Sequence, residues 1–100
     1  MKITKQNIID WSKPHPNNLM EARQTVLETN HLIISIVGGA KGLYGDFEND
    51  FEIALFNKDN NSFITKFFYP EGNDDVIGYM KGEEMEEFLN GLVQKGFQVR

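Results

Sequence analysis

Cysteine is absent from this sequence of 100 residues, which excludes disulfides, thiolate metal sites and a cysteine nucleophile. Long hydrophobic runs are also absent. No segment approaches the roughly 18 consecutive apolar residues of a membrane-spanning helix. The amino-terminal MKITKQNIIDW lacks the apolar core of a signal peptide. We therefore expect a cytoplasmic protein without a membrane partner.

The composition is that of a folded chain. Apolar residues make up 40% of the sequence and include eight phenylalanines, which is enough for a packed interior and argues against intrinsic disorder. A chain of this length is of the usual size for one hydrophobic core. We expect a single domain over residues 1–100.

Positive charge is scarce in the second half of the sequence. From Asp46 to Glu87 there are twelve Asp or Glu and three Lys, a net charge of −9, compared with −5 for the whole chain. Such a field repels the phosphate backbone of a nucleic acid and attracts a positively charged protein. The charge distribution therefore predicts no direct nucleic-acid contact through this region and a basic protein surface as partner.

Helix signals occur in the amino-terminal third. In NNLMEARQTVLETN, Asn18 and Glu21 have the spacing of a capping box, and apolar residues follow at helical intervals. This pattern predicts a helix over residues 18–30. A shorter helix is expected over residues 7–11, separated from it by Pro14 and Pro16.

Strand signals follow. HLIISIV, residues 31–37, is a short β-branched run that predicts a central strand buried on both faces. FEIALF at 51–56 and SFITKFFY at 62–69 flank the turn-forming NKDNN and predict a hairpin. VIGYM at 76–80 is expected to be a further strand.

The carboxy-terminal pattern predicts a helix. Apolar residues from Met85 to Val93 recur on one side, four Glu occupy the first turns, and Gly96 is placed to end the helix. The order of elements predicts an α+β fold: an antiparallel meander of three to four strands, with an N-terminal helical segment and a C-terminal helix packed on one face.

The glycine-rich stretch VGGAKGLYGDFENDFEIALF, residues 37–56, matches no known ligand loop. It lacks the lysine and following helix of a phosphate-binding loop and the G-x-G-x-x-G of a dinucleotide site. Its acidic residues do not have the spacing of a calcium-binding loop. We therefore expect no cofactor and no metal.

Catalytic signals are weak. The two histidines are His15, between prolines, and His31, at the start of a predicted strand, and neither has a recognisable nucleophile nearby in the sequence. We expect no catalytic residues and no enzyme activity. A small hydrolase or ligand-binding enzyme would need a deep pocket lined by His31 or by carboxylates with shifted pKa values.

The glycines leave two interpretations of the loop. It is either a plain long hairpin connection or a contact loop that presents Tyr and Leu to a partner, beside an acidic ring of Asp46, Glu48 and Asp50. Asp74 and Asp75 add acidic groups further along the chain. The predicted partner-binding residues are Lys41, Leu43, Tyr44, Asp46, Glu48, Asp50, Asp74 and Asp75.

A resemblance covers residues 33–92. The runs ISIVGGAKGLYGDFENDFEIALF and DDVIGYMKGEEMEEFL are similar to small accessory proteins of phages and mobile elements of Gram-positive bacteria. That family has no settled activity, so the resemblance transfers no catalytic residues. It implies a small acidic protein that blocks a host or rival protein.

Two functional hypotheses follow. The first is a small acidic, non-enzymatic protein-binding module that inhibits a host nucleic-acid-binding or defence protein. The alternative is a self-assembling structural subunit, such as a homodimer, which uses an exposed strand edge or the surplus aromatic residues Phe56, Phe67 and Phe68.

Overall fold

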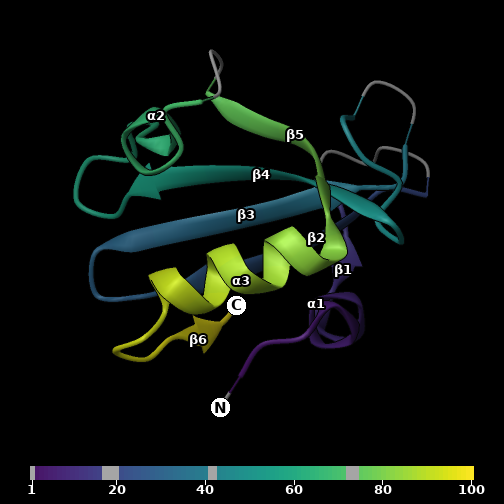
Figure 1. The fold of residues 1–100 in the computed structure, drawn as a ribbon, viewed down its shortest axis with the longest axis horizontal. Helices are drawn as coiled ribbons and strands as arrows, with labels where there is room; N and C mark the ends of the chain where they lie inside the picture. The colour runs from purple at the N-terminus through teal and green to yellow at the C-terminus, as the bar shows by residue number, and fades with distance from the viewer. Residues whose placement is uncertain (1, 17–20, 41–42, 72–74) are drawn as a thin grey trace.

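The computed structural model describes residues 2–16, 21–40, 43–71 and 75–100 (Figure 1). These residues form three helices and six strands. In chain order they are α1 Lys5–Trp11, β1 Lys13–Pro14, β2 Arg23–Glu28, β3 Leu32–Gly38, β4 Asp50–Asn57, α2 Thr65–Phe68, β5 Val76–Lys81, α3 Gly82–Leu92 and β6 Gln98–Val99.

The strands form one antiparallel sheet in the order β1-β2-β3-β4-β5. The short strands β1 and β6 both pair with β2, where Pro14 lies opposite Arg23 and Gln98 lies opposite Glu28. Helix α3 crosses one face of the sheet, and α1 lies beside it near β2 (Figure 1). The predicted α+β meander with helices on one face is confirmed, but its path has five strands rather than three or four.

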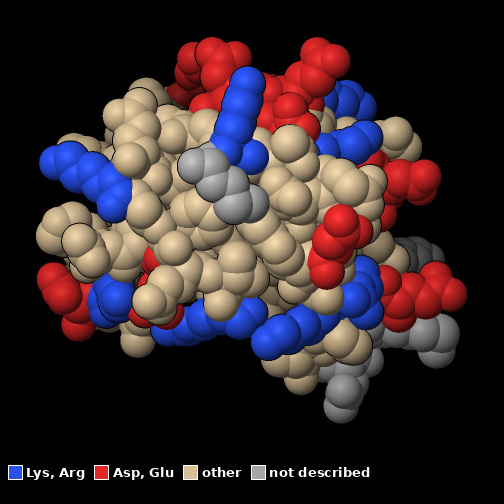
Figure 2. Space-filling model, turned by 90° about the horizontal axis from the view of Figure 1, so that it is seen from below, with Lys and Arg blue, Asp and Glu red and all other residues tan. Residues whose placement is uncertain are grey.

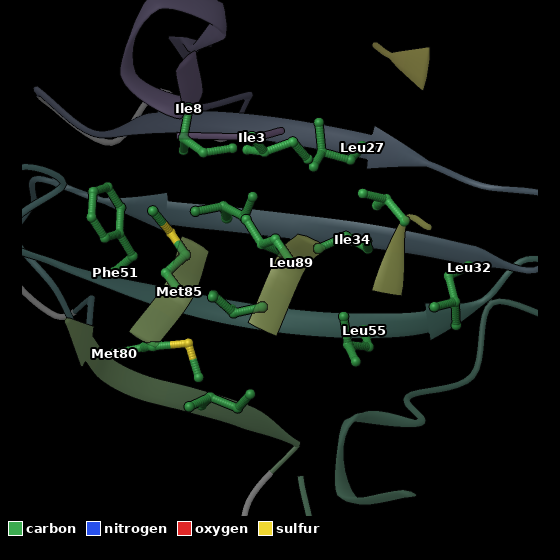
Figure 3. Packing of buried hydrophobic residues seen from close by; sticks show 14 of the residues in the cluster. Ile3, Ile8, Leu27, Leu32, Ile34, Phe51, Leu55, Met80, Met85 and Leu89 are labelled. Atoms are coloured by element: carbon green, nitrogen blue, oxygen red, sulfur yellow. The ribbon is translucent and has the colours of Figure 1, made fainter. Parts of the chain in front are cut away.

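The core lies between the helices and the sheet. Leu27, Ile34 and Leu55 stand side by side on β2, β3 and β4, and all three are fully buried. Met85 and Leu89 of α3 pack onto this row of side chains (Figure 3). Burial of each such side chain contributes about 1.5–3 kcal/mol to the free energy of unfolding.

Hydrogen bonds attach the amino-terminal segment to α3. The Asn90 side chain accepts from the Ile3 backbone N–H at 2.8 Å and donates to the Ile3 carbonyl at 2.8 Å. The Lys5 N–H donates to Glu86 Oε2 at 2.6 Å. These contacts bridge more than 80 residues of sequence, so α1 and α3 are held as neighbours on the sheet.

The predicted helix over residues 18–30 is wrong. Residues Arg23–Glu28 form β2, which pairs with β3 along its whole length, while Asn18 lies outside the described residues. Thr25 and Leu27 alternate into the core, and the Thr25 hydroxyl donates to the Ile8 carbonyl at 2.6 Å. Pairing with a central strand outweighs a local helical pattern, because helix propensity is a weak preference.

The predicted return strand over residues 62–69 is also wrong. Only Phe63 bridges Phe56, after which Thr65–Phe68 make the single helical turn α2. The buried Thr65 hydroxyl accepts from the Leu55 N–H at 2.9 Å and donates to the Asp75 carbonyl at 2.6 Å. The edge of β4 from Asp50 to Ala54 pairs instead with β5.

The remaining elements agree more closely with the sequence. The short helix, β3, β4, β5 and α3 lie where they were expected, and the NKDNN segment forms the turn after β4. However, β3 is not buried on both faces, because Ile33 and Ser35 are half-buried on the face that carries no helix. Helix α3 ends at Leu92, and Gly96, with φ +108°, follows in the turn beyond it.

None of the helices in the described residues is long and apolar enough to cross a bilayer.

Candidate functional site

The two ends of the sheet carry different surfaces. The connection between β3 and β4, together with the adjoining part of β5 around Gly78 and Tyr79, is here named the loop end. The opposite end, where α2, the β2–β3 turn and the last residues of α3 meet, is named the groove end (Figure 1). Antiparallel pairing of β3 with β4 places these ends apart, because β3 begins at one and finishes at the other.

The glycine-rich loop packs closely against the strands. Gly39 has φ +89°, and its N–H donates to the Gly45 carbonyl at 3.0 Å. A Cβ atom on Gly45 would lie 2.8 Å from the Phe51 Cα atom, closer than real Cβ atoms approach backbone. The glycines therefore allow close backbone approach and an unusual dihedral angle, which are the two properties that distinguish glycine.

Asp46 organises the turn that follows. Its Oδ1 atom accepts backbone N–H groups from Glu48 at 2.8 Å, Asn49 at 2.7 Å and Asp50 at 3.1 Å. The Asn49 N–H, with the other two amides and the Asn49 side chain, holds the pKa of Asp46 well below its usual range, against the opposing effect of partial desolvation. This carboxylate is therefore ionised and fixed in orientation.

Asp50 and Glu48 differ in their internal partners. Asp50 accepts the Asp46 N–H at 2.8 Å, and its second oxygen lies 3.4 Å from Lys81 Nζ. Glu48 is exposed, and its carboxylate has no hydrogen bond or ion pair within the described residues. Of the predicted acidic ring, Glu48 alone therefore presents a carboxylate without an internal contact.

An exposed pair of tyrosines stands beside this turn. Tyr44 is 48% exposed and Tyr79 is 60% exposed, and their ring centroids are 5.8 Å apart. The Tyr79 N–H donates to the Tyr44 carbonyl at 2.7 Å, and the Tyr44 N–H donates to Glu52 Oε1 at 3.1 Å. These hydrogen bonds hold the loop against β4 and β5 and leave both rings accessible.

Tyr79 was missed by sequence reasoning. It is held at φ +53°, and Gly78 before it leaves room for the Tyr44 side chain, whose Cβ atom lies 2.9 Å from an added Cβ. A glycine inside a strand often marks the close approach of another segment. The Gly78–Tyr79 step was the available signal, but only the fold shows which segment approaches.

A shallow depression of about 420 Å³ joins the turn to the tyrosine pair. It brings the predicted residues Leu43, Asp46 and Asp50 together with Tyr79. Carboxylates, a short apolar side chain and an aromatic ring are the groups that receive a lysine or arginine side chain. Among the described residues its lining comprises Gly39, Ala40, Leu43, Gly45, Asp46, Asp50 and Tyr79.

Other predicted contact residues lie elsewhere. Asp75 is exposed at the start of β5, where its carbonyl accepts the Thr65 hydroxyl at the groove end. Lys41 and Asp74 lie outside the described residues. Figure 2 shows the acidic side chains of one face in several separate groups with Lys and Arg between them. The acidic side chains therefore do not form one continuous patch on that face.

The groove end contains a larger and more apolar concavity of about 590 Å³. His31 lines it, as do Phe67 and Phe68, which the sequence had singled out for different reasons. Phe67 is 82% exposed at its rim. Its lining in the described part of the chain is Thr29, Asn30, His31, Leu32, Asn57, Ile64, Phe67, Phe68, Gly91, Leu92, Gln94, Lys95 and Gly96.

Metal ligands do not cluster in the described part of the chain: no three His, Asp or Glu side chains there are grouped so that they could hold an ion. Comparison with known proteins gives no family to set beside this geometry, since no family model, curated protein or solved structure matches the chain.

Proposed function

We propose that this chain is a non-enzymatic protein-binding module that docks its loop end on a positively charged protein surface. The observation that carries the proposal is the depression in which Asp46, Asp50 and Leu43 meet Tyr79, next to the exposed Tyr44. The partner would place a Lys or Arg side chain between the two carboxylates and the ring of Tyr79.

The chemistry of the loop end supports this role. Tyrosines are enriched among the residues that dominate binding energy at protein interfaces, because they bury a large rigid ring and retain a polar hydroxyl. The Asp46 carboxylate is already oriented by backbone amides, so less conformational freedom is lost when a cation binds. Glu48 lies two residues further along the same exposed turn and adds negative charge there.

The expected class of partner is a nucleic-acid-binding protein of the host. Such proteins carry basic surfaces that ordinarily face phosphate, and an acidic module attracts the same surface. The sequence resemblance to phage and mobile-element accessory proteins favours an inhibitor of a defence protein. Occupation of the basic surface would exclude the nucleic acid.

The first experiment is affinity capture from a bacterial host extract with three baits. These are the wild type, Tyr44→Ala with Tyr79→Ala, and Phe67→Ala as a control that removes an exposed aromatic ring at the other end. We expect the double variant to lose the captured partner and Phe67→Ala to retain it. The ring truncations leave the backbone hydrogen bonds of the loop in place, so the double variant should remain folded.

A second experiment uses the purified partner. Affinity should fall as salt is raised from 50 to 300 mM, since charge pairing across an exposed interface is screened. Reversal of charge at Glu48 should weaken binding, and the same reversal at Asp59, in the turn after β4, should not. Binding that is insensitive to salt, or that depends on Phe67 instead of the tyrosines, would reject the loop end as the interface.

Self-assembly remains the second candidate, favoured by the sheet face that carries no helix. Phe56 on this face contacts Phe63, which is 48% exposed. Their rings are tilted relative to each other, with centroids 4.6 Å apart. The adjacent Ile33 and Val26 are half-buried. Sedimentation at increasing concentration should show a dimer that Phe63→Ser disrupts. A monomer at all concentrations would contradict this alternative.

A further inference from the structure

We infer that the groove end is a binding site for a small amphipathic carboxylate, a molecule with an apolar body and a terminal carboxylate. This inference concerns a different surface from the proposed protein interface and stands independently of it. Its basis is the combination of an apolar groove with cationic and hydrogen-bonding groups in an otherwise acidic protein.

The groove has the size and lining of a small-molecule site. Its volume of about 590 Å³ lies in the range of roughly 300–1,000 Å³ that ligand pockets occupy. Leu32 at the start of β3, Ile64 before α2 and Leu92 at the end of α3 contribute apolar side chains from three elements. Phe67 and Phe68 extend this surface with two rings in an edge-to-face arrangement, whose centroids are 5.3 Å apart.

The charge of the lining selects an anion. Lys95 and His31 are the ionisable side chains among the groove residues, and no Asp or Glu belongs to the described lining. Within the described residues Lys95 forms no ion pair, whereas Lys58 and Arg100 nearby are both paired with Glu28. A carboxylate at the mouth would therefore meet an uncompensated cation, although the whole chain carries −5.

The architecture explains why this surface is available. The Thr65 hydroxyl accepts from the Leu55 N–H of β4 and donates to the Asp75 carbonyl just before β5, and these hydrogen bonds hold in place the turn that carries Phe67 and Phe68. Gly91 and Gly96 add no side chains, and no atom lies within 4 Å of a Cβ built on either. Hydrogen bonds of Thr65 therefore hold one wall of the groove in place, and the two glycines leave space in its lining.

The test uses decanoate as the probe and decylammonium as a matched probe of opposite charge, both added to the full-length protein labelled with ¹⁵N. We expect decanoate to shift the amide signals of Gly91 and Gly96 with a dissociation constant below about 1 mM, at the weak end of specific binding. The amides of Gly39 and Gly45 at the loop end serve as internal controls and should not move. Decylammonium should bind at least tenfold more weakly.

Variants assign the two parts of the site. Phe68→Ala should weaken decanoate binding about tenfold through lost apolar contact. Lys95→Met should weaken it three- to fivefold, as for an exposed charge pair, and should reduce the preference over decylammonium. Lys13→Met removes the same charge on β1 and should leave binding unchanged.

Several results would overturn the inference. They are the absence of shifts at Gly91 and Gly96 up to 2 mM decanoate, equal binding of the two probes, or shifts confined to the loop end. Sedimentation gives a further test. A dimer that Phe67→Ala dissociates and that excludes decanoate would show that a second copy of the chain occupies the groove instead.

Discussion

The loop end and the groove end are built by different forces, although the same two strands connect them. At the loop end, hydrogen bonds to Asp46 and glycine backbone contacts hold the chain in place. At the groove end, the buried Thr65 anchors a turn whose aromatic rings stay exposed. Strand β3, Leu32–Gly38, separates the ends by about 20 Å at the rise of an extended strand.

This difference shows how a small sheet can carry two independent surfaces. A charged turn tolerates exposure because its carboxylates remain hydrated, so it can present charge and tyrosine hydroxyls. Exposed phenylalanines gain nothing from water, so their accessibility indicates a place where something else can pack. Substitutions at the loop end should therefore affect backbone geometry, and substitutions at the groove end should affect the binding of apolar groups.

The largest expected effect is a difference in stability between alanine substitutions at Gly45 and at Gly91. Gly45→Ala should lower the free energy of unfolding by about 3 kcal/mol, because its Cβ would lie within 3.0 Å of backbone atoms of Asp50 and Phe51. Gly91→Ala in α3 is the matched control and should be neutral or stabilising by up to about 1 kcal/mol. Urea unfolding measures both. Equal losses at the two positions would remove the contrast between the ends.

The next effect tests the anchor of the groove end. Thr65→Val keeps the shape of the buried side chain but leaves the Leu55 N–H and the Asp75 carbonyl without their partner. We expect a loss of about 2 kcal/mol, the usual cost of unsatisfied buried groups. Urea unfolding should show this loss, while amide signals at Gly39 and Gly45 stay in place. Signal changes that reach the loop end would show that the two ends are coupled.

A smaller effect concerns pH at the loop end. Backbone N–H groups hold the pKa of Asp46 in the folded protein below its unfolded value. The contribution of the ionised Asp46 side chain to the free energy of unfolding is therefore fully present at pH values above the unfolded pKa. It is lost progressively as pH falls from there toward the lowered pKa of the folded protein. Asp46→Asn should cost about 1 kcal/mol at pH 7, the size of a capping bond. Thermal unfolding should show this difference shrinking toward pH 3.

The control for this measurement is Asp59→Asn. Asp59 lies in the turn after β4, and its carboxylate forms no hydrogen bond or ion pair within the described residues. This variant should show almost no change at either pH. If Asp46→Asn had the same destabilisation at pH 7 and pH 3, the ionised carboxylate would not be what stabilises the turn.

The smallest effect comes from the ion pair at the loop end. The Lys81 side chain is 71% exposed, and its Nζ atom lies 3.4 Å from Asp50 Oδ2. Lys81→Gln should change the free energy of unfolding by less than about 0.5 kcal/mol, since exposed pairs contribute little. The same variant should strengthen binding of a basic partner because it frees Asp50. Unchanged binding in a calorimetric titration with that partner would show that the loop end is not the interface.

Much of the fold was predictable from local pattern. The short β-branched run of β3, the NKDNN turn and the apolar stripe of α3 each carry a local signal that tertiary contacts did not oppose. The segments 23–28 and 62–69 were predicted wrongly because their local preferences conflicted with pairing at strand edges far away in sequence. Asp46 and Tyr44 could be identified as candidate site residues from their place in the glycine-rich stretch. Tyr79 and Lys95 could not be identified in this way.

The sequence by itself determined which residues are apolar, where the chain must turn and where negative charge accumulates, because these properties belong to single residues and their near neighbours. The tertiary structure alone decided that β5, rather than residues 62–69, pairs along β4. That choice sets Tyr79 beside Asp46 and Asp50 at the loop end. It also leaves Phe67 and Phe68 in the lining of one groove with His31 and Lys95, because only pairing between distant segments places these side chains together.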